Sequence, residues 1–111
     1  MAGELVKAKE NLKIGQRVEF YVEGDETRYA SRIEDMTDDT LEVAMPMTRQ
    51  GVPVIPKDNE KLYGVAVGNQ CRFRFFTVFK GTGQKDDRIP VWYVSKPEKM
   101  ERFQNREFVR V

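Results

Sequence analysis

Short segments in which apolar and polar residues alternate recur along this chain of 111 residues, separated by turn-forming residues about every ten positions. In residues 17–22, Val18, Phe20 and Val22 share one face of an extended chain, because successive side chains of a strand point to opposite faces. Comparable segments lie at 28–34, 41–45, 62–67, 71–80 and 89–94. This spacing predicts an all-β barrel or sandwich. We favour a small antiparallel six-stranded β-barrel, because closure leaves no exposed sheet edge.

One segment after the last of these strands carries a helical signal. Ser95 is a suitable N-cap, Pro97 suits the first turn, and Glu98 stands three residues after the serine. Met100 and Phe103 would then share a face of the helix. We therefore predict a barrel over residues 1–96, followed at 97–111 by a short C-terminal helix and linker.

The composition limits the class of protein. The chain of 111 residues has the length of one ordinary domain. Its composition, with 40% hydrophobic and 33% charged residues, is typical of a folded protein. No stretch approaches the roughly 18 apolar residues of a membrane span, and the N-terminus has no apolar signal core. Cys71 has no partner for an intrachain disulfide, so a cytoplasmic protein is expected. Histidine is absent and no catalytic or metal-ligating constellation stands out, so we predict no enzyme, cofactor or metal site.

Two motifs suggest a ligand site but have a plainer interpretation. Residues 34–42 hold five carboxylates, yet the alternating ligands and central glycine of a calcium loop are missing. A solvated hairpin turn is favoured there. Gly81-Thr82-Gly83 lacks the Gly-Lys-Ser/Thr sequence and the following helix of a phosphate loop, so we assign residues 81–87 to a hairpin loop.

Cations and aromatic rings alternate in Arg72-Phe73-Arg74-Phe75-Phe76. The plainer interpretation is a half-buried strand with Phe73 and Phe75 pointing inward and the arginines outward. The other is a surface on which single-stranded nucleic acid stacks its bases. A small β-barrel that binds single-stranded nucleic acid is therefore our alternative function. Cys71 and Trp92 are both expected in the core.

The charge of the chain is unevenly distributed. Residues 1–70 hold 9 Lys/Arg against 13 Asp/Glu, and residues 71–111 hold 10 against 5. The cationic part contains Arg106 and Arg110, four residues apart, which project to the same side of either a strand or a helix. A guanidinium group can donate two parallel hydrogen bonds to a phosphate and can stack on a base. One interpretation is therefore that both arginines bind the same anionic ligand. An ordinary exposed strand is the other.

The last eight residues, Gln104-Asn105-Arg106-Glu107-Phe108-Val109-Arg110-Val111, resemble the segment that opens a PilZ domain, the bacterial receptor module for cyclic di-GMP. The turn at Leu12-Lys13-Ile14-Gly15 and the acidic hairpin resemble the N-terminal β-barrel domain of flagellar-brake PilZ proteins, so the resemblance covers essentially the whole chain. It implies that Arg106 and Arg110 contact the phosphates and guanine bases of cyclic di-GMP, the ligand of the intact protein. It also implies regulation of flagellar motility with motor proteins as partners, and no binding of nucleic acid.

The chain departs from the family pattern in two ways. Many relatives carry adjacent arginines where this chain has Asn105-Arg106. The D/N-x-S-x-x-G stretch that completes the nucleotide site does not occur, because Ser31 and Ser95 both lack an Asp or Asn two residues earlier. We therefore expect the N-terminal half of a two-domain receptor, with its PilZ barrel beyond Val111. The 111 residues alone are expected to bind cyclic di-GMP weakly or not at all.

Overall fold

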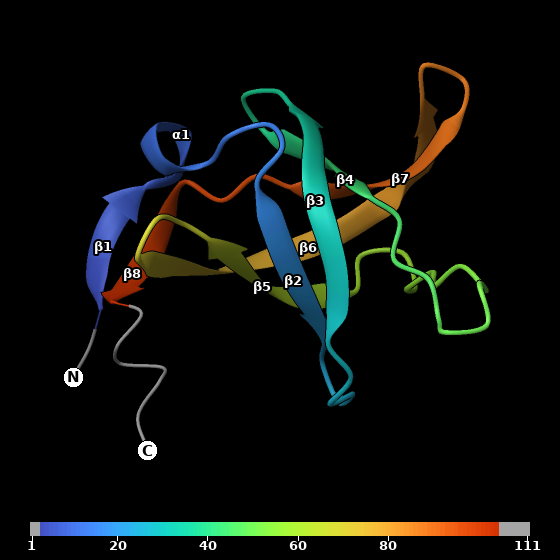
Figure 1. The fold of residues 1–111 in the computed structure, drawn as a ribbon, viewed down its shortest axis with the longest axis horizontal. Helices are drawn as coiled ribbons and strands as arrows, with labels where there is room; N and C mark the ends of the chain where they lie inside the picture. The colour runs from blue at the N-terminus through green and yellow to red at the C-terminus, as the bar shows by residue number, and fades with distance from the viewer. Residues whose placement is uncertain (1–2, 105–111) are drawn as a thin grey trace.

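The computed structural model describes residues 3–104, in which eight strands form one antiparallel sheet that closes on itself. The elements in chain order are β1 (Glu4–Lys7), α1 (Ala8–Asn11), β2 (Arg17–Val22), β3 (Tyr29–Met36), β4 (Thr40–Ala44), β5 (Lys61–Val67), β6 (Cys71–Lys85), β7 (Ile89–Ser95) and β8 (Lys99–Gln104). The strand order is β1-β8-β6-β5-β2-β3-β4-β7, and an additional pairing of β6 with β7 closes a ring of six strands (Figure 1). β8 and then β1 extend the sheet beyond that ring.

The ring confirms the prediction of an antiparallel six-stranded barrel. Five of its strands begin and end within two residues of the expected positions, and β2 matches at both ends. β6 is longer than expected, because Gly81, Thr82 and Gly83 continue the strand instead of forming a loop. The turn consists of Asp86, Asp87 and Arg88, because Lys85 pairs with Ile89, and Asp86 and Asp87 have left-handed φ angles of 54° and 56°.

Inward-facing aromatic side chains fill the barrel at alternate strand positions. The ring of Phe20 lies edge-on to that of Phe75, with centroids 6.4 Å apart, and the ring of Phe79 meets Trp92 at 5.5 Å. The Trp92 indole N–H donates a hydrogen bond of 2.8 Å to the carbonyl oxygen of Val54, so its polar atom is satisfied although the residue is fully buried. Trp92 therefore belongs to the core, as expected, and so does Cys71.

The helix predicted after Ser95 is wrong, because the described part of this segment forms strand β8. β7 pairs with β6 at Phe79–Lys85, and β8 pairs with the same edge of β6 at 71–74. Residues 96–98 connect the two strands along that edge. An unpaired edge of β6 offers hydrogen bonds to the arriving chain, and this tertiary pairing outweighs a local capping signal.

Ser95 satisfies polar groups where the β6–β7 ladder stops. Its hydroxyl oxygen accepts a hydrogen bond of 3.0 Å from the Val78 N–H, and its carbonyl oxygen accepts one of 2.5 Å from the Thr77 hydroxyl. The two hydroxyl oxygens lie 2.8 Å apart. Because the Thr77 proton is directed to the carbonyl, the Ser95 hydroxyl donates to Thr77. Ser95 thus stabilises a strand junction instead of capping a helix.

The N-terminal elements attach to the outer edge of the sheet. β1 pairs with β8, and the Ala8 N–H at the start of α1 donates to the Glu98 carbonyl oxygen at 3.0 Å. α1 is a single turn, and it is the only helix among residues 3–104. None of the described helical structure has the length and apolar character needed to cross a membrane.

Candidate functional site

The two predicted ligand contacts, Arg106 and Arg110, lie outside the described residues. The structure does describe the place from which the chain runs toward them. β8 is held between β1 and β6, and its last residue, Gln104, lies opposite Cys71 at the start of β6. The path toward Arg106 therefore begins at a fixed point at one end of the barrel.

A hollow of about 510 Å³ adjoins this point and includes the turn that carried the resemblance. Lys13, Ile14 and Gly15 line it together with Arg102 of β8. The side chain of Gln16 holds the turn in place: its carbonyl oxygen accepts from the Lys13 N–H at 2.9 Å, and its amide donates to the Val67 carbonyl oxygen at 3.2 Å. The fold thus brings residues 13–15 and the end of β8, almost 90 positions apart in the sequence, to the same end of the barrel.

Arg102 is the fixed cation of this hollow. Hydrogen bonds to the Cys71 side chain and to the Glu4 carboxylate raise the pKa of its guanidinium above the ordinary value. The Arg102 Nη1 to Glu4 Oε1 distance is 3.1 Å. The charged residues that line this hollow are Lys13, Arg102 and Glu10, which leave a net charge of +1.

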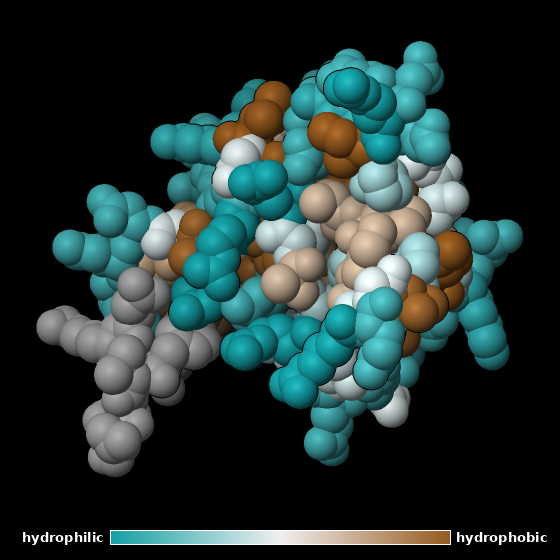
Figure 2. Space-filling model, turned by 45° about the vertical axis from the view of Figure 1, so that its right-hand side comes forward, coloured by the Kyte–Doolittle hydropathy of each residue, from teal (hydrophilic) through white to brown (hydrophobic). Residues whose placement is uncertain are grey.

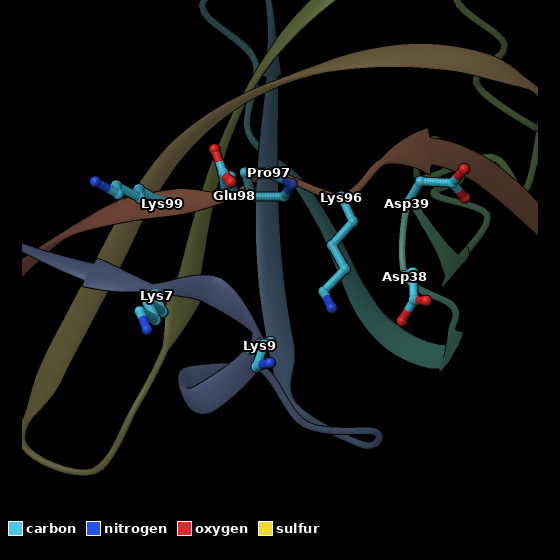
Figure 3. A pocket seen from close by; sticks show the side chains of 8 residues that line it. All are labelled: Lys7, Lys9, Asp38, Asp39, Lys96, Pro97, Glu98 and Lys99. Carbon is cyan, nitrogen blue, oxygen red and sulfur yellow. The ribbon is translucent and has the colours of Figure 1, made fainter.

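A second hollow, of about 450 Å³, has charges of both signs (Figure 3). Lys96 extends from the β7–β8 connection, with Lys9 on one side of it and Asp38 on the other. The complete lining is Lys7, Lys9, Asp38, Asp39, Lys96, Pro97, Glu98 and Lys99. Four lysines against three carboxylates leave a charge of only +1, so this hollow is a mixed ionic surface and not a dedicated anion site.

The acidic segment forms the turn between β3 and β4, as predicted. The Thr37 N–H donates to the Thr40 carbonyl oxygen at 2.8 Å, and the Thr40 N–H donates back to the Thr37 hydroxyl at 3.2 Å. Over residues 3–104, no group of three or more His, Cys, Asp or Glu side chains is arranged to hold a metal ion.

The strand of alternating cations and rings has the plainer of its two predicted arrangements. Phe73 and Phe75 are buried at 5% and 3% exposure, and Arg72 and Arg74 point outward. The nucleic-acid alternative required Phe73 and Phe75 as stacking platforms, and their burial removes both.

A row of outward-facing rings that we did not predict crosses three strands. Tyr21 of β2 lies opposite Tyr63 of β5, which lies opposite Phe76 of β6. The ring centroids are 5.8 and 5.5 Å apart, and Phe76 is 77% exposed. The sequence does contain one signal: Phe76 directly follows the inward Phe75, so it must point outward. The cross-strand partners, 13 and 55 positions earlier, become visible only from the register.

Further exposed apolar side chains lie in the loop between β4 and β5. Met47, Val52 and Ile55 are 48%, 55% and 61% exposed. Figure 2 shows the molecule with the right-hand side of Figure 1 turned toward the viewer. On this face, small hydrophobic patches are separated from one another by hydrophilic side chains. Scattered apolar groups of this kind are normal on a folded protein, so they indicate no site by themselves.

Comparison with known proteins agrees with the predicted family. The family model PilZNR, described as flagellar protein YcgR, matches residues 13–97. Among solved structures, the inhibitor of motility from Bacillus subtilis (MotI/DgrA) is similar, with a TM-score of 0.68 and 25% sequence identity. That match covers 84% of this chain and 46% of the other, so the chain spans less than half the length of this relative. No curated protein sequence matches significantly.

Proposed function

The chain belongs to the PilZNR family of flagellar YcgR proteins, and from this membership we propose that it is the regulatory and interaction domain of a bacterial cyclic di-GMP receptor that controls flagellar motility. In this proposal Arg106 and Arg110 contribute half of the nucleotide site, and a following PilZ barrel contributes the rest. The domain is cytoplasmic, non-catalytic and acts on a component of the flagellar motor.

The observation that supports this proposal most directly is the shared location of three features. The Lys13–Gly15 turn, the cation Arg102 and the end of β8 lie at one end of the barrel. A guanidinium pair beyond Gln104 that grips two phosphates would bring the ligand beside this end. Ordering of a short connection by such contacts fixes the orientation of two domains, which is a recognised form of switch.

The test of the arginine assignment uses a longer chain that includes the following domain. We expect isothermal titration calorimetry with cyclic di-GMP to show binding, and Arg106→Ala or Arg110→Ala to weaken it at least about tenfold, since a charged hydrogen bond contributes roughly 1.5–3 kcal/mol. Arg88→Ala, in the exposed turn between β6 and β7, is the matched control and should leave the affinity unchanged. Unchanged affinity in both Arg106→Ala and Arg110→Ala contradicts the assignment.

The half-site proposal has a separate test on the 111-residue chain. Titration of this chain with cyclic di-GMP should give weak binding or none, because the D/N-x-S-x-x-G half is missing. Micromolar affinity would show that these residues form a complete site on their own.

A further inference from the structure

We propose that the outer face of β2, β3, β5, β6 and β8 is a docking surface for an acidic segment of a partner protein that carries an aromatic or aliphatic anchor residue. We call this surface the docking face and define it by three rows of outward side chains that run across the strands. The rows follow from the strand register, and each has a different chemical character.

The first row is aromatic and consists of Tyr21, Tyr63 and Phe76. A shallow hollow of about 260 Å³ lies beside it, lined mainly by these rings and by Leu62 and Val22. At 77% exposure Phe76 is the most exposed large apolar side chain of the described residues. Tyrosines and phenylalanines at a surface hollow are typical anchors of protein interfaces, because they bury much area with little loss of side-chain freedom. Here Phe76 is exposed, and Tyr21 and Tyr63 are half-buried beside it.

The third row is cationic. Arg32 of β3 lies directly opposite Arg17 of β2. On the other side of β2, the register leads from Arg17 to Val67 of β5, and Val67 lies opposite Arg72 of β6, so Arg72 belongs to the same row. The Arg17 and Arg32 side chains are 70% and 62% exposed. Like charges directly opposite on neighbouring strands destabilise a sheet. Within the fold this repulsion is offset, because Glu19 lies beside Arg17 and Arg72 and Glu34 lies beside Arg32 at 3.6–4.0 Å. The largely exposed guanidinium groups of Arg17 and Arg32 remain accessible to an anionic partner.

The middle row runs from Glu19 of β2 through Val65 of β5 and Arg74 of β6 to Glu101 of β8. It combines a buried acid, Glu19, with the partly exposed Glu101. The Glu19 residue is 8% exposed, and its carboxylate lies 3.9–4.0 Å from guanidinium nitrogens of Arg17, Arg28 and Arg72. Arg74 is held by Glu101 of β8 through two hydrogen bonds, the longer of 3.1 Å. On this face five arginines and Lys61 oppose Glu19, Glu23, Glu34 and Glu101, which leaves a net charge of +2. Charge complementarity therefore selects an acidic occupant.

The same geometry disfavours single-stranded nucleic acid as the occupant. A base needs an open ring face on which to stack. The rings of the aromatic row lean on one another at 55° and 56°, and the Arg74 guanidinium lies 6.0 Å from the Tyr63 centroid and 4.5 Å from that of Phe103. These contacts partly cover Tyr21, Tyr63 and Phe103, whereas Phe76 stays 77% exposed. One open ring suits a single apolar anchor better than the series of platforms on which successive bases stack.

The experiment is a selection that does not assume the partner sequence. The 111-residue chain is immobilised and panned with a random 16-residue peptide library on phage, and an Arg17→Glu/Phe76→Ser variant is used for counter-selection. We expect the enriched peptides to be acidic and to share a central aromatic or aliphatic residue. Enrichment of basic or neutral peptides, peptides that also bind the variant, or no enrichment overturns the proposal.

Fluorescence anisotropy of a selected peptide then measures the contributions of the two rows. Phe76→Ser and Arg17→Glu should each raise the peptide Kd at least about tenfold, and added salt should weaken binding. Ile55→Ser and Arg49→Glu are the matched controls, since both lie in the exposed β4–β5 loop. They should change the Kd less than about twofold, because they remove no contact of the docking face.

Two further measurements test whether single-stranded nucleic acid or a second copy of the chain binds this surface instead. A fluorescein-labelled oligo(dT) that binds more tightly than the peptide and loses affinity in Arg17→Glu would identify a nucleic-acid surface and overturn the proposal. Dimerisation in sedimentation velocity that is lost in Phe76→Ser would identify a self-association surface and overturn it equally. Circular dichroism spectra that are unchanged between variants exclude unfolding as the cause of lost binding.

Discussion

The inner and outer faces of the sheet formed by β2, β5 and β6 are made by the same three strands but carry different residues. Inward positions hold Phe20, Phe73 and Phe75, which are buried against the barrel core. Outward positions hold Tyr21, Tyr63 and Phe76. The comparison separates the two roles of one strand, because the inner face determines the fold and the outer face remains available for recognition.

The sharpest test of this difference compares the adjacent residues Phe75 and Phe76. Phe75→Ala should lower the free energy of unfolding by about 3–5 kcal/mol, because it leaves a cavity beside Phe20. Phe76→Ala should change it by less than about 0.5 kcal/mol, because the ring is largely in solvent. Urea denaturation followed by Trp92 fluorescence measures both. Equal losses would show that the two faces are not distinct.

Gly64 provides a test of packing on the inner face. A Cβ atom built there would lie 2.5 Å from the Phe75 ring, so Gly64→Ala should cost about 1–3 kcal/mol by overpacking. Val65→Ala, one residue later and outward, is the control and should cost less. Combining Gly64→Ala with Phe75→Leu should recover part of the loss, since the smaller side chain makes room. Additive losses in the double variant would contradict this steric explanation.

The strand junction at Ser95 is tested by removing its hydroxyl. Ser95→Ala should cost about 1–3 kcal/mol, because the Val78 N–H loses its acceptor. The Thr77 hydroxyl loses the contact with the Ser95 hydroxyl but keeps its bond to the backbone carbonyl oxygen. Glu98→Ala should leave the free energy of unfolding within about 0.5 kcal/mol, because its side chain is exposed. A loss in Glu98→Ala as large as that in Ser95→Ala would instead indicate the capped helix that we first predicted.

The smallest effect is expected at the turn between β2 and β3, away from both faces. The Thr27 N–H and the Tyr29 hydroxyl donate to Asp25 at 2.9 and 2.7 Å, and these bonds hold the pKa of Asp25 below its ordinary value of 3.8. A lowered pKa in the folded state stabilises the fold above pH 3.8 and loses this effect as the pH falls through the folded-state value. The stability difference between the unsubstituted chain and Asp25→Asn should therefore shrink on acidification. A difference independent of pH between 2 and 6 would contradict this linkage.

At alkaline pH the same contact makes the free energy of unfolding fall as the pH rises, opposite to its effect at acidic pH. The hydrogen bond to Asp25 raises the pKa of Tyr29 above 10.0, so its stabilisation is present below that pH and disappears as the pH rises through the folded-state value. Tyr29→Phe should abolish this alkaline dependence and can be followed in the same denaturation series.

The accuracy of the sequence predictions depended on how local the determining interaction is. The alternation in β2 is a local consequence of one face being buried, and it placed Arg17–Val22 correctly. β1 (Glu4–Lys7) has only four residues and is stabilised by β8, almost 100 positions away, so no local pattern indicates it. The capping signal at Ser95 was genuine local chemistry, but a distant edge of β6 offered more hydrogen bonds.

The same reasoning applies to the surfaces. The inward orientation of Phe73 and Phe75 was predictable because alternation is local. The rows of the docking face were not, because they are defined by registers between β2, β3, β5 and β6 that no single segment contains. The grouping of Lys13 with Arg102 at one end of the barrel has the same cause.

The placement of β8 between β1 and β6 also has a mechanical consequence. Both neighbours pair with it antiparallel, so a pull on the chain beyond Gln104 along the strand axis loads two hydrogen-bond ladders in shear. Several bonds then share the load and must break together, whereas a sideways pull opens them one at a time. The barrel therefore resists tension along β8 and yields to peeling, which makes it a direction-sensitive anchor for whatever the chain is joined to.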